Sequence, residues 1–197
     1  AASFTQVQSI DPGRGMSGVS SARGFVAADY NGDGYSDLFI PRGDTGNQGD
    51  VPLVFINDGA GNFVAKPQVL PAEAAPRATV GDVDGDGDLD IVYGATGDTV
   101  PGDGAVLLND GNGNFMVGQS SFEVSAIKLG DADGDGDLDA VVLSDGLALW
   151  KNDGAGNFQF HHTVMPGANG PYVVTDFDGD GDLDLTCSAN DRVQSMV

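Results

Sequence analysis

The sequence predicts an all-β protein, a β-propeller made of four-stranded antiparallel blades, with about four blades in its 197 residues. Three observations predict this fold. A nine-residue acidic loop occurs four times, a second turn motif occurs three times between its copies, and short segments rich in β-branched and aromatic residues flank both. These segments are too short, and too often interrupted by turns, to form helices.

The acidic loop begins at Asp29, Asp82, Asp131 and Asp176, with the spacing of a repeat protein. Each copy has oxygen-bearing side chains at loop positions 1, 3, 5 and 9 and glycine at positions 4 and 6. Carboxylates this close together repel one another strongly unless a cation lies among them. A hard cation with roughly six to eight oxygen ligands suits this set, and calcium tolerates flexible geometry better than magnesium does. We therefore predict a structural Ca²⁺ site in each loop, about four ions in all.

The second motif, Asn-Asp-Gly-x-Gly-Asn-Phe, occupies residues 57–63, 109–115 and 152–158. Asp-Gly and Gly-Asn between short strands indicate hairpins, because tight turns need residues that accept positive φ. We expect strands around these turns, for example at 78–81 and 89–94. One unit is then a strand, the acidic loop, a strand, a loop, a strand, the Asn-Asp-Gly turn and a last strand, which is the size of one propeller blade.

The repeat divides the single predicted domain, residues 1–197, into four units. They are residues 11–70, 71–121, 122–166, and 167–197 together with 1–10. The last unit stops before its Asn-Asp-Gly turn and fourth strand, whereas Ala-Ser-Phe-Thr-Gln-Val at residues 2–7 resembles the strand that follows this turn elsewhere. We expect the N-terminal strand to complete the last blade, or that of a neighbouring subunit, because pairing would cover exposed strand edges.

Charge and hydropathy argue against two classes of partner. The 30 acidic and 8 basic residues give a net charge of −22, and 18 of the acids lie in the four loops. Such a surface, without clusters of lysine and arginine, repels nucleic acid and anionic membranes. No apolar run approaches the ~18 residues of a membrane span. We expect no nucleic-acid partner and no membrane insertion.

Cysteine content and the first residues bear on the compartment. Cys187 is the one cysteine and lies in an apolar segment, so we expect no intramolecular disulfide and a buried, unreactive thiol. The opening Ala-Ala-Ser has no basic or apolar leader region, so we expect any signal peptide to have been removed already. Weak calcium loops function where calcium is millimolar. We therefore expect an extracellular protein, secreted or on the cell surface.

The succession of strand, Asp-x-Asp-Gly-Asp-Gly-x-x-Asp loop, strand and Asn-Asp-Gly-x-Gly-Asn-Phe turn resembles the FG-GAP/VCBS repeats of integrin-like β-propellers, over nearly the whole chain. This resemblance implies that each loop binds Ca²⁺ through the side chains at positions 1, 3, 5 and 9 and the backbone carbonyl at position 7. The implied ligands are Asp29, Asn31, Asp33, Tyr35 and Asp37; Asp82, Asp84, Asp86, Asp88 and Asp90; Asp131, Asp133, Asp135, Asp137 and Asp139; and Asp176, Asp178, Asp180, Asp182 and Asp184.

The resemblance also implies a setting and raises a question of size. Members are typically adhesion modules, lectins or propeller domains attached to enzymes, and they are secreted or displayed on cells. They usually close with about seven blades, whereas this chain has four units. The chain is therefore a fragment of a larger propeller, a four-bladed ring or a piece that assembles with other copies.

Two other interpretations of the loops are weaker. An EF-hand loop needs an acid at position 12 and helical flanks, but position 12 is occupied by Ile40, Tyr93, Val142 and Cys187, all in predicted strands. An acidic turn that binds no metal is improbable in four matching copies. The first loop should bind calcium most weakly, because Asn31 replaces a carboxylate and Tyr35 replaces an aspartate.

No residues indicate an enzyme. Adjacent strand residues point to opposite faces, so His161 and His162 should not chelate a metal together. No Ser/His/Asp set, Cys–His pair or phosphate loop is recognisable. Arg42-Gly43-Asp44, an adhesion-like triplet, arises easily by chance in a chain rich in glycine and aspartate. The aromatic residues Tyr93, Trp150 and Tyr172 could stack on sugars, but we expect them in the core between blades.

The first functional hypothesis is a calcium-stabilised binding or adhesion module for an extracellular protein or glycan. A second is a self-assembling subunit of a filament or surface layer, in which copies exchange their terminal strands. A third is the non-catalytic propeller part of a larger extracellular enzyme. Ligand choice should depend on the long variable loops, residues 42–52 and 95–104.

Overall fold

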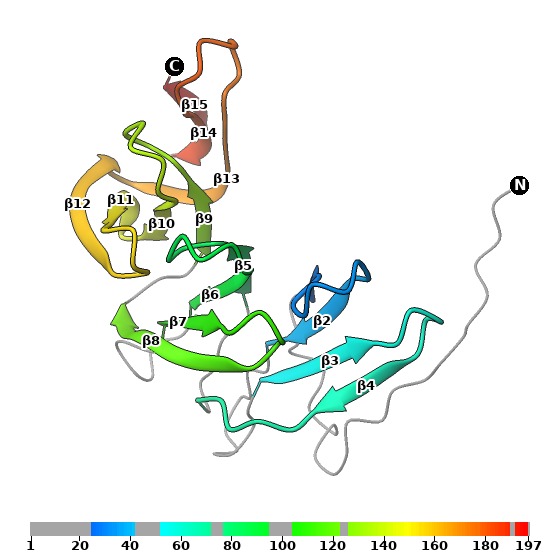
Figure 1. Ribbon diagram of the computed structural model, residues 1–197. Coiled ribbons are helices and arrows are strands. Elements are labelled where there is room, and N and C mark those ends of the chain that lie inside the picture. The colour runs from blue at the N-terminus through cyan, green and yellow to red at the C-terminus, as the bar shows by residue number, and fades with distance from the viewer. Residues whose placement is uncertain are drawn as a thin grey trace, which may run out of the picture.

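The computed structural model describes residues 25–41, 52–71, 77–94, 104–122, 126–189 and 192–196, and all regular structure in these ranges is β-strand. The strands form four antiparallel sheets that follow one another along the chain, here called blades 1 to 4 (Figure 1). The described residues include no helix that could cross a membrane.

The strand bounds are as follows. Blade 1 contains β1 (Val26–Ala28), β2 (Asp37–Ile40), β3 (Leu53–Asn57) and β4 (Phe63–Lys66). Blade 2 contains β5 (Arg77–Gly81), β6 (Asp90–Gly94), β7 (Gly104–Asn109) and β8 (Phe115–Phe122). Blade 3 contains β9 (Ala126–Gly130), β10 (Asp139–Ser144), β11 (Gly146–Asn152) and β12 (Phe158–Met165). Blade 4 contains β13 (Ala168–Thr175), β14 (Asp184–Ala189) and β15 (Arg192–Met196).

Each blade is a meander whose strands lie in chain order. The acidic loop joins its first two strands, and in blades 1 to 3 the Asn-Asp-Gly turn joins its last two, which confirms the predicted order of elements. The residue before the acidic loop pairs in every blade with position 9 of that loop. These pairs are Ala28 with Asp37, Gly81 with Asp90, Gly130 with Asp139, and Thr175 with Asp184.

Blade 4 has three strands among the described residues. The sequence predicts this, since no Asn-Asp-Gly turn follows β15. The N-terminal residues 1–10, predicted to supply the missing strand, lie outside the described residues, as do Arg42-Gly43-Asp44 and nearly all of the loops 42–52 and 95–104.

The core consists of layers between neighbouring blades. Tyr30 and Phe115 pack edge to face between blades 1 and 2, with ring centroids 5.4 Å apart. Val83 and Phe158 lie in the layer between blades 2 and 3. Tyr172 of blade 4 is buried against blade 3, where its hydroxyl donates to the carbonyl of Val141 at 2.8 Å. Burying an aromatic ring between sheets stabilises the array strongly, and isolated blades have no comparable core.

The predicted core aromatics are confirmed. Tyr93 and Tyr172 are buried, and Trp150 lies in β11, the third strand of its blade, packed partly buried against the layer between blades 2 and 3. Cys187 is buried in β14, again as predicted.

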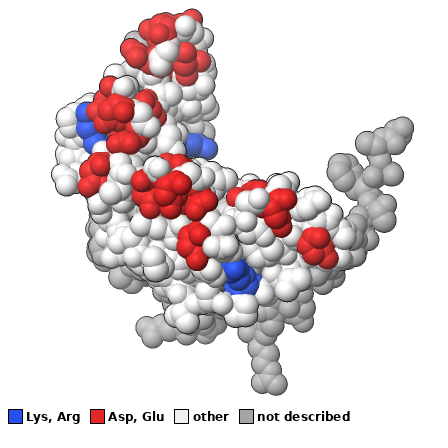
Figure 2. Space-filling view, in the orientation of Figure 1, with Lys and Arg blue, Asp and Glu red and all other residues white. Residues whose placement is uncertain are grey.

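The blades fan out along an arc in which the first strands of neighbouring blades contact one another. The outer strands β3 and β4 of blade 1 and β14 and β15 of blade 4 lie at opposite ends of this arc (Figure 1). The acidic side chains gather in separate clusters that follow the arc (Figure 2).

The prediction that His161 and His162 point to opposite faces is wrong. Leu149 pairs with His162 and Trp150 pairs with Phe160, so the register shifts and His161 is the extra residue of a β-bulge. A bulge breaks the alternation of side chains, and the two imidazole rings lie on one side with centroids 4.8 Å apart. Both side chains are exposed.

Candidate metal centres

The carboxylate at position 1 closes each acidic loop on itself. In the second loop Asp82 accepts hydrogen bonds from the N–H groups of Gly85 and Gly87, at 2.8 and 3.0 Å. Both glycines have positive φ, 75° and 94°, which is unfavourable for residues with a Cβ. The same pair of hydrogen bonds occurs in the third and fourth loops. The glycines at positions 4 and 6 thus allow two backbone amides to donate to the carboxylate at position 1.

The carboxylate at position 9 is buried and joins the loop to the blade. Asp90 is fully buried; one of its oxygens accepts from the amide of Val83 at 2.9 Å and the other from the amide of Asn109 at 2.8 Å. Burial raises the pKa of Asp90 to about 6, although the two backbone hydrogen bonds act in the opposite direction. Burial likewise raises the pKa of Asp37 and of Asp139. These acids release a proton more readily if a cation is beside them.

The acids at positions 1, 3 and 9 converge in three of the loops, where each offers an oxygen within 4.8 Å of the other two. The groups are Asp82, Asp84 and Asp90; Asp131, Asp133 and Asp139; and Asp176, Asp178 and Asp184. Burial, and then the charges of Asp86 and Asp82, raise the pKa of Asp84. Hard, anionic oxygens that converge on one point suit a divalent cation of the calcium type. The donor set therefore fits the predicted ion.

The residues at positions 5 and 7 lie outside these groups. Asp86 at position 5 accepts a hydrogen bond from the amide of Asp88 at 2.9 Å, and the third and fourth loops repeat this bond. The side chain at position 7 lies across the turn between the third and fourth strands: a Cβ on Gly111 would come within 2.4 Å of Asp88 Oδ2. The ligand role that the resemblance implies for the backbone carbonyl at position 7 stays a prediction.

The first loop differs in its polar contacts. Its Asn31 donates from Nδ2 to Asp33 at 3.0 Å and accepts the amide of Asp33 at 3.1 Å. Asp29 accepts from the amide of Gly34 at 2.7 Å, and buried Asp37 accepts from the amides of Tyr30 and Asn57, as the position 9 acids do in the second and third loops. The frame of the loop is therefore preserved, with one negative charge fewer at position 3.

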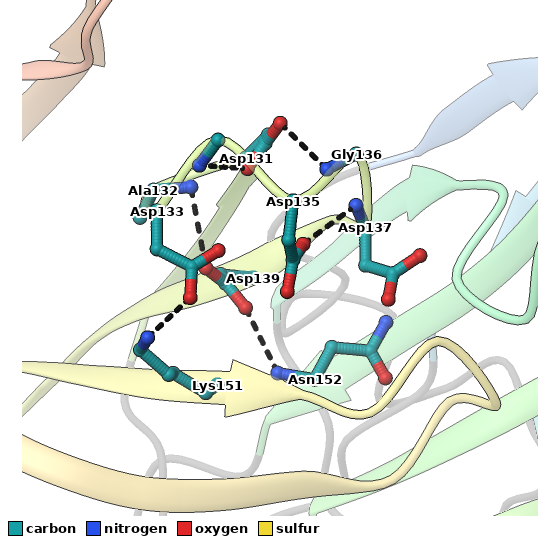
Figure 3. A network of polar contacts seen from close by, with 10 residues as sticks. Asp131, Ala132, Asp133, Asp135, Gly136, Asp137, Asp139, Lys151 and Asn152 are labelled. Carbon is teal, nitrogen blue, oxygen red and sulfur yellow. Dashed lines mark hydrogen bonds and ion pairs between the residues drawn. The ribbon is translucent and has the colours of Figure 1, made fainter.

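The third loop has a cation of its own (Figure 3). Lys151 of β11 reaches Asp133 and forms an ion pair with it. This contact lowers the pKa of Asp133 and raises that of Lys151. The residue before the turn asparagine is Ile56 in blade 1 and Leu108 in blade 2, so of the three blades with this turn only blade 3 has a lysine next to its acids. Sequence analysis missed this contact because it involves a single substitution in one repeat.

The asparagine that opens the Asn-Asp-Gly turn links neighbouring blades. Asn109 Nδ2 donates to the carbonyl of Leu89 in its own blade and to that of Tyr30 in blade 1, at 3.1 and 2.9 Å. Asn152 repeats this with Leu138 and with Val83 of blade 2, at 3.2 and 2.7 Å. The sequence signal is the recurrence of the asparagine itself, but a turn motif alone does not predict a bond to the preceding blade.

A cavity of about 450 Å³ lies among the first strands of the blades, apart from the acidic loops. Residues of all four blades line it, among them Phe25, Arg77, Lys128, Asn169 and Tyr172. Among the described residues that line it, none is acidic. Arg77 and Phe25 lie at the beginnings of their strands, away from the acidic loops that follow the strand ends. The cavity therefore combines aromatic surface with two cations in an otherwise acidic chain.

Comparison with known proteins agrees with this geometry. The profile of the FG-GAP-like repeat matches residues 29–93, 82–142 and 131–187, and each match runs from position 1 of one acidic loop to the strand after the next. No curated protein sequence matches the chain.

Among solved structures, the chain superposes with a TM-score of 0.57 on a lectin from Agrocybe aegerita, whose structure concerns specific recognition of non-reducing terminal N-acetylglucosamine. The two are 22% identical, and the alignment covers 86% of this chain and 50% of the lectin chain. This chain thus spans about half the length of the lectin. The likeness shows a β-propeller fold, and with the three profile matches it places the chain in the FG-GAP-like repeat family.

Proposed function

We propose that this chain is a calcium-stabilised β-propeller module that acts outside the cell by binding a ligand, and that it is not an enzyme. The observation that carries the proposal is the convergence of three carboxylates in each of three loops, as in Asp82, Asp84 and Asp90. A cation at that point removes the repulsion and couples metal binding to folding. Affinity of such self-contained loops suits the high calcium level outside cells.

The test is calorimetric titration of the EDTA-treated chain with Ca²⁺, followed by thermal unfolding with and without the ion. We expect about four ions per chain and a melting temperature that rises with free calcium. The matched variants are Asp84→Asn in the second loop and Asp58→Asn, which lies in an exposed turn. The first should weaken one binding event, as Asn31 is expected to do in the first loop, and the second should weaken none. A melt that does not respond to calcium would contradict the proposal.

The proposed ligand is a glycan, and the proposed site is the cavity among the first strands. The lectin likeness supports this class of ligand, and the exposed ring of Phe25 provides aromatic surface on which a sugar ring can pack. Arg77 and Lys128 favour a sugar that carries a carboxylate, because a guanidinium holds a carboxylate through paired, charge-assisted hydrogen bonds.

A binding screen should compare neutral oligosaccharides with uronic-acid oligosaccharides in the presence of Ca²⁺. We expect preference for the acidic sugars, and a loss of at least tenfold in affinity for Arg77→Gln combined with Lys128→Gln. Arg192→Gln, an exposed cation of β15 that does not line the cavity, is the control. Binding that is unchanged in the double variant would move the ligand site elsewhere.

A further inference from the structure

The contact between neighbouring blades follows one pattern, repeated twice. The backbone carbonyl of the residue at loop position 2 of one blade accepts a hydrogen bond from the turn asparagine of the next blade. The side chain of the same residue packs in the apolar layer between the two blades. Tyr30 offers its carbonyl to Asn109, and Val83 offers its carbonyl to Asn152. Both Tyr30 and Val83 are only 1% exposed.

The two ends of the arc each expose one half of this contact. At the end of blade 4, Phe177 occupies loop position 2 and is 53% exposed. At the start of blade 1, Asn57 Nδ2 donates to Ser36 of its own loop, and this is its one acceptor among the described residues. Asn57 is also more exposed than the buried Asn109 and Asn152. An acceptor with its aromatic side chain and a donor are therefore available at opposite ends of one molecule.

A second contact between blades joins loop position 8 of one blade to the residue just before the acidic loop of the preceding blade. Inside the arc, a leucine at loop position 8 packs on the small residue before the preceding loop. A Cβ on Gly81 would lie 2.7 Å from Leu138 Cδ1, and one on Gly130 would lie 2.5 Å from Leu183 Cδ1. These approaches are possible because neither glycine has a side chain.

The end residues depart from this pattern in opposite directions. Thr175 of blade 4 stands where Gly81 and Gly130 stand, as its pairing with Asp184 shows. A leucine from another blade would collide with it. Loop position 8 of blade 1 is the small, exposed Ser36. The larger Thr175 of blade 4 is thus complemented in size by the smaller Ser36 of blade 1. Among the four blades, blade 1 alone has a residue smaller than leucine at loop position 8.

We propose that blade 4 of one chain packs on blade 1 of a second copy through this contact, with Asn57 donating to the Phe177 carbonyl and Ser36 lying against Thr175. Blades 1 and 4 of one chain lie at opposite ends of the arc (Figure 1), so their complementary faces do not meet within the described arc and can meet between two copies. The chain spans half of a propeller chain in the lectin comparison. Two copies joined at both ends would form one closed ring with two identical junctions.

The first test is the mass of the calcium-loaded chain by size exclusion with light scattering, over about a hundredfold range of protein concentration. We expect a species of about 40 kDa, twice the 20.1 kDa of one chain, in exchange with monomer. Monomer alone at every concentration would overturn the proposal. A ladder of larger polymers would overturn the two-copy ring.

The second test exchanges the sizes at the junction. Ser36→Leu should weaken the dimer at least tenfold, because a leucine would strike Thr175. Adding Thr175→Gly should restore it, since the junction then has the Leu–Gly pair used inside the arc. Each substitution installs the residue that other blades carry at that position, so both variants should fold. Failure of the second change to rescue the dimer would contradict the assigned packing.

A third comparison isolates the exposed aromatic. Phe177→Asp should abolish the dimer, whereas Phe160→Asp, at a residue 56% exposed on the outer strand of blade 3, should leave it intact. Equal dimerisation of both variants would overturn the assignment. All measurements are made with calcium present, so their failure would leave the calcium and glycan proposals standing.

Discussion

The side-chain amide of Asn109 donates a hydrogen bond of 2.9 Å to the carbonyl of Tyr30, although the two residues lie in different blades. The backbone amide of the same asparagine donates to Asp90, the position 9 acid of the second loop. One turn residue is thereby connected both to the candidate metal centre of its own blade and to the loop of the blade before it. We infer that a cation in one loop stabilises the packing of two blades.

Replacing Asn109 by alanine should therefore destabilise the protein by about 1–3 kcal/mol, because the buried carbonyl of Tyr30 loses its partner. The matched control is Asn114→Ala, in the same turn, whose exposed side chain bonds locally to Asp110. We expect less than about 0.5 kcal/mol for this control. Urea unfolding with calcium present measures both. If Asn109→Ala and Asn114→Ala lowered the free energy of unfolding equally, the hydrogen bond between blades would contribute no more than a local turn bond.

Lys151→Leu should raise the calcium affinity of the third loop. The ammonium group of Lys151 is already paired with the Asp133 carboxylate. A calcium ion must therefore displace the lysine or bind beside its positive charge, and either weakens binding. Leucine is the residue that blade 2 carries at this position, Leu108. Calorimetric titration should show one of the binding events becoming tighter by several-fold, and Lys151→Arg, which keeps the charge, should not show this. Unchanged affinity in Lys151→Leu would mean that the ion pair does not compete with calcium.

The repeated parts of this fold could be predicted from the sequence, because regularly spaced motifs indicate a regularly repeated structure. Positions 1, 3 and 9 of the loops, and the order of strands around them, follow from the fourfold repeat of aspartate and glycine. Contacts between repeats were not accessible. Nothing local in the sequence distinguishes an asparagine that forms a turn from one that also bonds to Tyr30, 79 residues away.

Departures from the repeat were also hidden. The bulge at His161 arises from the pairing of β12 with β11, and strand alternation predicts the wrong side for its ring. The cavity lined by Arg77 and Lys128 is assembled from the first strands of different blades, whereas variable loops were the expected location of a ligand. Both features depend on tertiary arrangement rather than on local pattern.

The stability of the calcium-free protein should fall as pH rises. Burial raises the pKa of Asp90 from 3.8 to about 6 in the folded chain, so its protonated form is favoured by folding. This contribution is fully present below about pH 4 and is lost as pH rises through about 6, and it amounts to about 3 kcal/mol. Urea unfolding in EDTA at several pH values measures it.

Asp90→Asn should reduce this pH dependence, since it removes one of the buried acids with a raised pKa and leaves Asp37 and Asp139. With calcium bound the trend should reverse, because the ion requires the ionised carboxylate and competes with the proton. A calcium-free protein that gains stability from pH 4 to pH 7 would contradict the assignment of a raised pKa to Asp90.

Cys187 should report on blade 4 and on its packing against blade 3. Its thiol is 2% exposed, lies 2.9 Å from the sulfur of Met165, and has a pKa raised by burial. Alkylation requires an accessible thiolate, so labelling at neutral pH should be very slow in the calcium-loaded protein. Because Asp184 joins the fourth loop to β14, removing calcium should loosen the strand and accelerate labelling. Asp178→Asn should also accelerate labelling with calcium present, though less than calcium removal does, whereas Asp84→Asn, in the second loop, should affect labelling much less. Equal labelling rates in all three proteins would show that the fourth loop does not stabilise its blade.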